Sequence, residues 1–186
     1  VRMRNRYTVT YQMRKQKRQR REKIIGYILK FAAVILAAFL IVRFVCFSFT
    51  IQGDSMMPTY ESGEKHLVNR LICQIKGPSR YDVVVFRTDD EKNDSYYVKR
   101  VIGLPGETIQ IKKGKVYIDG KKAKSFSDED ILSAGLAADE ITLKSDEYFV
   151  LGDNSNNSED SRSSSIGNVK RSNVIGKISI KYWPWG

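Results

Sequence analysis

A basic segment followed by a long apolar run is the feature that most constrains how this chain folds. Residues 1–23 carry ten Lys or Arg side chains against one acid, Glu22, and residues 24–42 carry a single charge, that of Lys30. A helix over residues 24–42 would span roughly 28 Å, which is close to the thickness of the apolar layer of a membrane. We therefore predict one N-terminal transmembrane helix over residues 24–47, with a cleaved signal peptide and a soluble core helix as the alternatives.

The net charge of +11 invites a nucleic-acid-binding interpretation, but most of this charge lies in the first segment. Subtracting the ten bases and one acid of residues 1–23 from the totals of 32 and 21 leaves 22 basic and 20 acidic residues, so the rest is nearly neutral. Basic residues beside a membrane segment favour the cytoplasmic side. We therefore expect a cytoplasmic tail over residues 1–23, a lipid bilayer around residues 24–47, an extracellular body over residues 48–186, and no nucleic acid as a partner.

Cysteine and histidine are too few for a disulfide framework or a histidine-based metal centre. Cys46 lies at the end of the apolar run and Cys73 in the body, so we expect the two not to meet, and they lack the spacing of metal ligands. His66 is the only histidine and lies among charged residues, which predicts an exposed side chain. We expect no metal and no cofactor.

The body of the chain shows the pattern of a mainly β protein. Runs of β-branched and aromatic residues, separated by turn residues, predict strands. These runs are residues 81–87, 96–102, 108–111, 115–118, 147–151 and 174–182, with an acidic turn at 89–94, a hairpin turn at 113–114 and one short helix at 128–140. The pattern favours a barrel-like or folded antiparallel sheet with a small inserted β/α subdomain over residues 107–146.

Ser55 is the first candidate for chemistry, because Gly53 and Pro58 place it in a turn soon after the apolar run. A serine hydroxyl needs a base to act as a nucleophile. The Gly-x-Ser-x-Gly elbow of many hydrolases is absent, because Met57 occupies its last position. A Ser–His–Asp arrangement would have to use His66 as its base. The alternative to a catalytic role for Ser55 is an ordinary surface turn.

Lys99 is a second candidate for the base. In a strand its side chain shares a face with Tyr97 and Val101, and lysine is rarely buried without a partner. Burial disfavours the charged form and lowers the pKa, and a shift of ~3 units costs roughly 4 kcal/mol. The alternative is an edge strand in which Lys99 reaches solvent. The polar segment 151–162 is either a solvated loop or a support for such a site.

Taken together, these segments resemble the type I signal peptidases, also called leader peptidases. Four blocks follow the order of that family: residues 53–59 with a Ser-Met-x-Pro-Thr core, residues 81–87, residues 97–107 and residues 152–162. One apolar span and a short body are more similar to Gram-positive members than to the larger Gram-negative ones. The resemblance implies a membrane-bound serine endopeptidase that removes signal peptides from exported preproteins through an acyl-enzyme.

The resemblance also implies a role for each matching residue. Ser55 would be the nucleophile and Lys99 the general base, with Ser158 orienting the amine. Asp160 would brace the site through an ion pair with Arg162 or Arg100. The oxyanion would be met by the Ser55 N–H. Gly53 stands where some members carry a second, hydroxyl donor, so no side chain supplies one here and the second donor stays unassigned.

Four apolar residues match the family's shallow substrate pockets for small residues, which implies cleavage after Ala-x-Ala-like sites. They are Phe49, Ile51, Met56 and Val98. A self-cleaving repressor peptidase with a Ser–Lys pair, a pilus assembly factor that has lost catalysis, and a nucleic-acid binder are the alternatives. The apolar run argues against the first, the presence of both Ser55 and Lys99 against the second, and the near-neutral body against the third.

Overall fold

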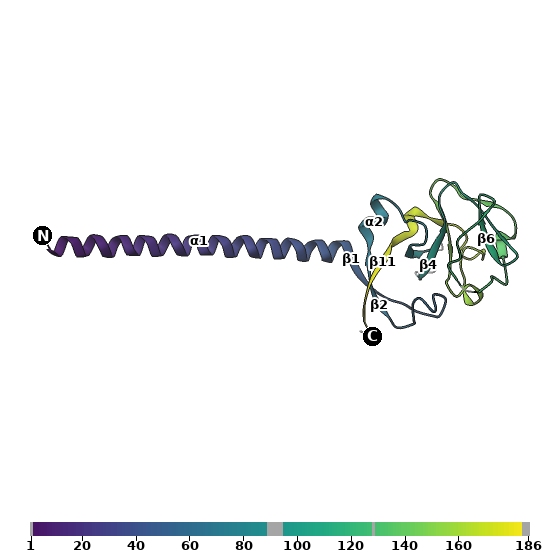
Figure 1. Ribbon diagram of the computed structural model, residues 1–186, viewed down its shortest axis with the longest axis horizontal. Coiled ribbons are helices and arrows are strands. Elements are labelled where there is room, and N and C mark those ends of the chain that lie inside the picture. The colour runs from purple at the N-terminus through teal and green to yellow at the C-terminus, as the bar shows by residue number, and fades with distance from the viewer. Residues whose placement is uncertain (1, 89–94, 128, 184–186) are drawn as a thin grey trace. The chain divides into compact units, whose positions relative to one another are not determined.

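The computed structural model describes residues 2–88, 95–127 and 129–183 (Figure 1). The chain divides into two compact units, residues 1–44 and residues 45–186, and each is described by itself. The acidic turn predicted at 89–94 lies outside the described residues.

The first unit is a single long helix, α1 (Arg2–Val45). It includes the basic segment, and Arg18 forms an ion pair one turn along with Glu22 at 3.0 Å. Leu29, Phe31 and other apolar side chains of the predicted membrane segment are more than half exposed in the isolated chain. Within the part of the chain that the structure describes, no helix meets the length and hydropathy needed to cross a membrane.

The second unit contains two antiparallel sheets. The larger sheet has the order β1-β2-β11-β3-β4-β9-β10 and the smaller one the order β7-β6-β5-β8. The strands of the larger sheet are β1 (Cys46–Thr50), β2 (Lys65–Asn69), β3 (Val83–Arg87), β4 (Tyr96–Gly103), β9 (Glu147–Leu151), β10 (Val169–Lys170) and β11 (Val174–Trp183). Those of the smaller sheet are β5 (Thr108–Lys112), β6 (Lys115–Ile118), β7 (Lys121–Lys122) and β8 (Ile141–Thr142). The mainly β prediction is confirmed.

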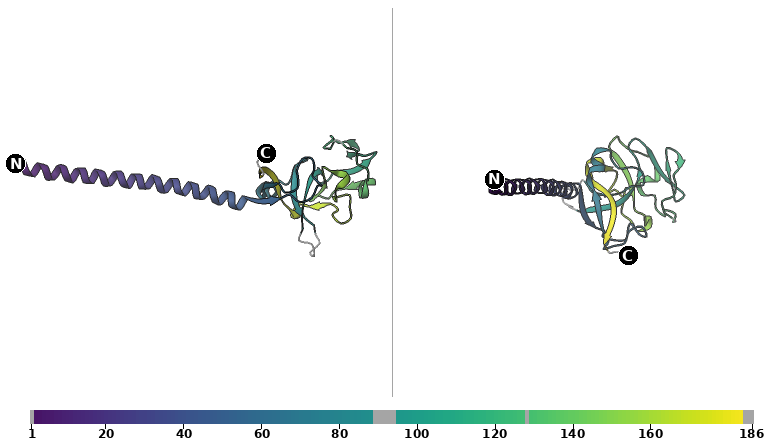
Figure 2. Two further views of the ribbon diagram at one scale, coloured as in Figure 1. Left: turned by 90° about the horizontal axis from the view of Figure 1, so that it is seen from below. Right: turned by 60° about the vertical axis from the view of Figure 1, so that its left-hand side comes forward.

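The smaller sheet lies toward one end of this unit, and β1, β2 and β11 lie toward the other. Figure 1 shows this separation, and both views of Figure 2 agree with it. The β5–β6 hairpin turns at Lys113 and Gly114, whose φ values of 50° and 72° are those of a two-residue primed turn. The hairpin predicted there is confirmed.

The helix predicted over residues 128–140 is wrong for the described part of that range. Only a short 3₁₀ turn, η1 (Gly135–Ala138), forms there. The backbone bonds to other segments instead of to itself, because Ile131 N donates to the Gly114 carbonyl and Leu136 N donates to the Arg162 carbonyl. Two further 3₁₀ turns are η2 (Ser155–Asn157) and η3 (Arg171–Asn173).

A short helix that the sequence did not reveal, α2 (Arg70–Ile75), follows β2. Asn69 caps its first turn, because the side-chain oxygen accepts a hydrogen bond from Ile72 N at 3.3 Å. Cys73, on this helix, is buried, and both it and Cys46 are free thiols.

Three apolar clusters form the core, and one of them underlies the candidate site. Each fully buried large aliphatic side chain contributes about 1.5–3 kcal/mol relative to an exposed one. The members of this cluster are Ile51, Met56, Val68, Val83, Val85, Val98 and Ile178. They come from β2, β3, β4 and β11 and from the loop after β1, so the larger sheet and this loop are packed as one body.

Candidate active site

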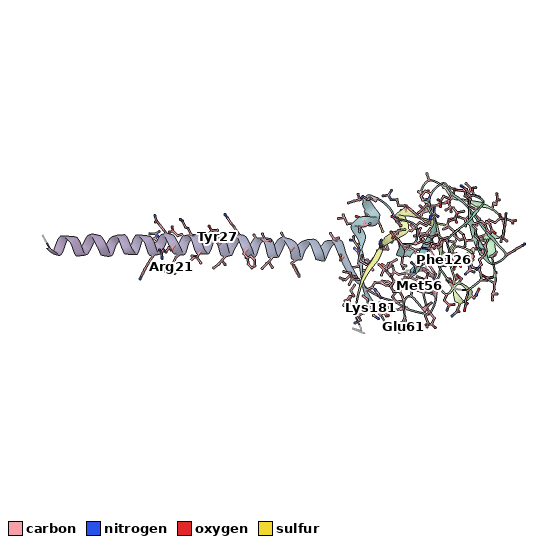
Figure 3. All side chains as sticks on the ribbon, viewed as in Figure 1. Arg21, Tyr27, Met56, Glu61, Phe126 and Lys181 are labelled. Atoms are coloured by element: carbon pink, nitrogen blue, oxygen red, sulfur yellow. The ribbon has the colours of Figure 1, made fainter. Side chains whose placement is uncertain are left out.

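The loop that carries Ser55 follows β1 and is closed at its base by backbone hydrogen bonds. Ile51 N donates to the Glu64 carbonyl at 2.9 Å. Gly53 adopts a left-handed φ of 78°, which glycine tolerates without strain. Met56, labelled in Figure 3, is 1% exposed and anchors the loop in the core. The neighbouring Ser55 is half-buried as a result.

A second loop, after β9, holds the Ser55 loop from the other side. Asn154 donates from its backbone N to the Ser55 carbonyl at 3.0 Å. Its side-chain Nδ2 donates to the Asp54 carbonyl at 3.2 Å. Both bonds fix the backbone around the serine and leave the hydroxyl for another partner.

That partner is Lys99, on β4. Its Nζ lies 2.6 Å from Ser55 Oγ, within hydrogen-bond distance. The edge-strand alternative is wrong, because β4 pairs with β3 on one side and with β9 on the other, and Lys99 is only 4% exposed.

The surroundings of Lys99 favour a neutral amine. Burial lowers the pKa of Lys99 from its ordinary 10.5 to about 8. The nearby carboxylates of Asp160 and Glu159 act in the opposite direction, but loss of hydration outweighs them. The amine is therefore able to accept a proton under mildly alkaline conditions.

Ser55 and Lys99 open into a groove with a volume of about 520 Å³. The four apolar residues predicted to shape the substrate pockets all line it, namely Phe49, Ile51, Met56 and Val98. Sequence reasoning did not assign the remaining lining residues, which are Thr50, Gln52, Ser95, Tyr96, Tyr97 and Glu159.

Asp160 and Arg162 form a buried ion pair beside the site. Arg162 Nε donates to Asp160 Oδ1 at 2.8 Å, and Gly152 N donates to Asp160 Oδ2 at 3.1 Å. Arg162 also donates from Nη1 to the Ser133 carbonyl at 2.9 Å, so it ties the inserted region to the loop after β9. Such charge-assisted bonds compensate the loss of hydration.

Arg100 is not the partner of Asp160. Its Nε donates to Asp153 Oδ1 at 2.7 Å, and its Nη1 donates to the Tyr81 carbonyl at 2.9 Å. Of the two predicted partners of Asp160, the structure therefore pairs it with Arg162. Asp153 was given no role from sequence, because its pairing with a strand 53 positions away leaves no local pattern.

Ser158 does not make the hydrogen bond to Lys99 that the resemblance implies. Its hydroxyl is buried and has no hydrogen-bond partner among the residues described. The Lys99 amine is bonded to Ser55 instead. Ser158 packs against Gly152, where an added Cβ would lie 2.2 Å from the Ser158 hydroxyl.

His66 is buried, so its predicted exposure is wrong. It lies on β2, which is an interior strand between β1 and β11. Its Nε2 pairs with Glu64 Oε2 at 2.8 Å, and its ring packs against the Tyr60 ring in a T-shaped arrangement with 4.9 Å between centroids. The only base hydrogen bonded to Ser55 among the described residues is Lys99, which argues against a Ser–His–Asp triad. No three potential metal-ligating side chains cluster within residues 2–88, 95–127 and 129–183.

Three comparisons show which known proteins this chain is similar to. Residues 24–183 match the family described as signal peptidase, peptidase S26. The chain is 33% identical over 185 residues to signal peptidase IB of Staphylococcus aureus strain COL, which covers 89% of this chain and 92% of that protein. It is 38% identical over 167 residues to signal peptidase I of Bacillus caldolyticus, which covers 83% and 88%. A crystal structure of a signal peptidase I from Enterococcus faecalis V583 aligns with a TM-score of 0.47 at 32% identity, covering 56% of this chain and 99% of that one.

Proposed function

The chain belongs to the signal peptidase, peptidase S26, family, and from this premise we propose that Ser55 and Lys99 form the dyad with which it cleaves exported preproteins. The supporting observation is the 2.6 Å separation of Lys99 Nζ and Ser55 Oγ. The burial of Lys99 adds to it, because burial makes the neutral amine accessible.

In the first step the neutral Lys99 amine accepts the proton of the Ser55 hydroxyl as Oγ attacks the carbonyl carbon of the scissile bond. Ser55 N–H then donates to the oxyanion that develops in the tetrahedral intermediate. Gly53 supplies no side-chain donor at this point, so the backbone donor is the only one that we assign.

The intermediate collapses when the C–N bond breaks and the Lys99 ammonium gives its proton to the leaving amine. The preprotein is thereby cut, and its signal peptide remains as an ester on Ser55. A water molecule then loses a proton to Lys99 and attacks the ester carbon. Ser55 recovers its proton from Lys99 as the signal peptide leaves, so the enzyme is restored.

The groove supports cleavage after small residues. Phe49, Ile51, Met56 and Val98 give it apolar walls next to the dyad. We propose that these walls accept small side chains one and three residues before the cut, as in an Ala-x-Ala sequence. Asp160, held by Arg162, would support the loop behind Lys99, and Ser158 would orient the amine when a hydrogen bond to it forms.

The decisive experiment compares Ser55→Ala and Lys99→Ala with the unchanged full-length protein in detergent, using a preprotein with an Ala-x-Ala site. We expect cleavage to fall at least ~10²-fold in either variant, because loss of either partner leaves no activated nucleophile. Lys112→Ala, at an exposed position of the smaller sheet, is the matched control and should cleave at the original rate. Native-rate cleavage by either dyad variant would reject the assignment.

A further inference from the structure

We propose that Glu159 is a specificity-determining residue of the groove, which favours basic side chains and disfavours acidic ones in the part of the preprotein next to the scissile bond. This inference rests on the proposed function, because it assumes that the substrate lies in the groove at Ser55. It adds a charge preference to the size preference already described.

Glu159 lies where a bound peptide must pass. It lines the same groove as Ser55 and Lys99, and among the lining side chains in the described part of the chain only Lys99 and Glu159 carry charges. The carboxylate is also close enough to Lys99 to influence it electrostatically. A substrate that reaches the dyad therefore comes near this carboxylate.

The Glu159 carboxylate is held in place by a neutral partner. The Ser165 hydroxyl donates to Glu159 Oε1, and Ser165 Oγ lies 2.7 Å from Ser163 Oγ in the same turn. The neighbouring carboxylate of Asp160 differs, because it is buried and neutralised by Arg162. The hydrogen bond from Ser165 positions Glu159 without cancelling its charge.

The proposed mechanism requires a neutral Lys99, which leaves the negative charge of Glu159 uncompensated in the groove. When Lys99 is neutral and able to act as the base, Glu159 is the only charged group on the groove wall within the residues described. An acidic side chain on the peptide is then repelled and a basic one attracted. Because Glu159 is exposed, the effect is moderate and sensitive to salt.

The test uses peptides that share an Ala-x-Ala cut site and carry Glu, Gln or Lys at one other position within a few residues of the cut. The kcat/KM of each is measured at about pH 9, where Lys99 is mostly neutral, so that changes in its titration do not alter the ratios. The variants are Glu159→Gln, Glu159→Lys and Ser165→Ala. Glu140→Gln removes an exposed carboxylate outside the groove and is the matched control.

At one or more positions we expect the Lys peptide to be cleaved about threefold to tenfold faster than the Glu peptide by the unchanged protein. The ratio should fall to about one in Glu159→Gln, reverse in Glu159→Lys, fall partly in Ser165→Ala, and stay constant in Glu140→Gln. In about 1 M salt, where the Debye length is ~3 Å, it should shrink.

Equal Lys-to-Glu ratios in the unchanged protein and Glu159→Gln would overturn this inference while leaving the dyad intact. Failure of the proposed function looks different, because no peptide would then be cleaved in a way that depends on Ser55. Cleavage of the uncharged Gln peptide, compared between the unchanged protein and Ser55→Ala, separates the two outcomes.

Discussion

At the scale of the single residue, the candidate site contains an amine, that of Lys99, which the fold keeps away from water. Lys99 was a candidate from strand alternation alone, and its pairing with Ser55 followed from the resemblance. Its near-complete burial was not readable from the sequence, because it requires β3 and β9 on either side of β4. The partner of Arg100 could not be predicted from the sequence either, because Asp153 lies near Arg100 only in the folded sheet.

Activity should rise with pH through about 8, because only the unprotonated Lys99 amine can accept the Ser55 proton. At pH 7 about one tenth of the molecules would carry a neutral amine. Measuring kcat/KM of an uncharged peptide from about pH 5 to 10 checks this, with Ser55→Ala subtracted as background. A profile that is flat between pH 6 and pH 9 would contradict a lysine base.

Replacing Lys99 with Met should abolish activity and raise stability at neutral pH. The pKa of Lys99 is lower in the folded protein than in the unfolded chain, so the unfolded chain binds more protons between about pH 8 and 10.5. The cost of this burial, on the order of 3 kcal/mol, is therefore fully present below about pH 8 and is relieved as pH rises toward 10.5. Denaturant unfolding should show that the gain in free energy of unfolding of Lys99→Met over the unchanged protein is smaller at pH 10 than at pH 7. A gain that increases with pH would contradict this explanation.

At the scale of the element, alternating residues predicted the strands that have clear turn residues at both ends. Strands were missed where the apolar or charged character of the surrounding sequence hid the alternation. β1 (Cys46–Thr50) continues directly from the apolar helix, and β2 (Lys65–Asn69) begins within a charged stretch. The helix expected at 128–140 had suitable Ala and Leu residues, but Gly135 with a φ of 53° and hydrogen bonds to distant carbonyls determine its backbone.

The loop after β9 approaches the Ser55 loop so closely that Gly152→Ala should lower kcat by about tenfold or more. A Cβ there would lie 2.2 Å from Ser158 Oγ and 2.6 Å from the Ser55 carbonyl oxygen, so the loops must separate. Such a shift at reacting groups is costly to the rate. Steady-state kinetics of Gly152→Ala beside the unchanged protein provide the check. No loss in the single variant would show that the loops are looser than described.

At the scale of the whole molecule, we propose that residues 24–47 anchor the protein, with residues 1–23 in the cytoplasm and residues 48–186 outside. External protease should then digest the body in intact cells and spare the first segment. Changing the ten basic residues of 1–23 to Gln should increase the fraction of molecules whose body is protected, because the positive charge that retains this end inside is lost. Immunoblots for tags at the two ends measure both results. Protection of the body in the unchanged protein would reverse the topology.

Ser55 Oγ and Lys99 Nζ belong to residues 44 positions apart, and the larger sheet brings β4 beside the loop that follows β1. A chain still emerging from the ribosome holds the serine long before it holds the lysine in register. The proposed dyad is therefore complete only when β4 has paired with β3 and β9.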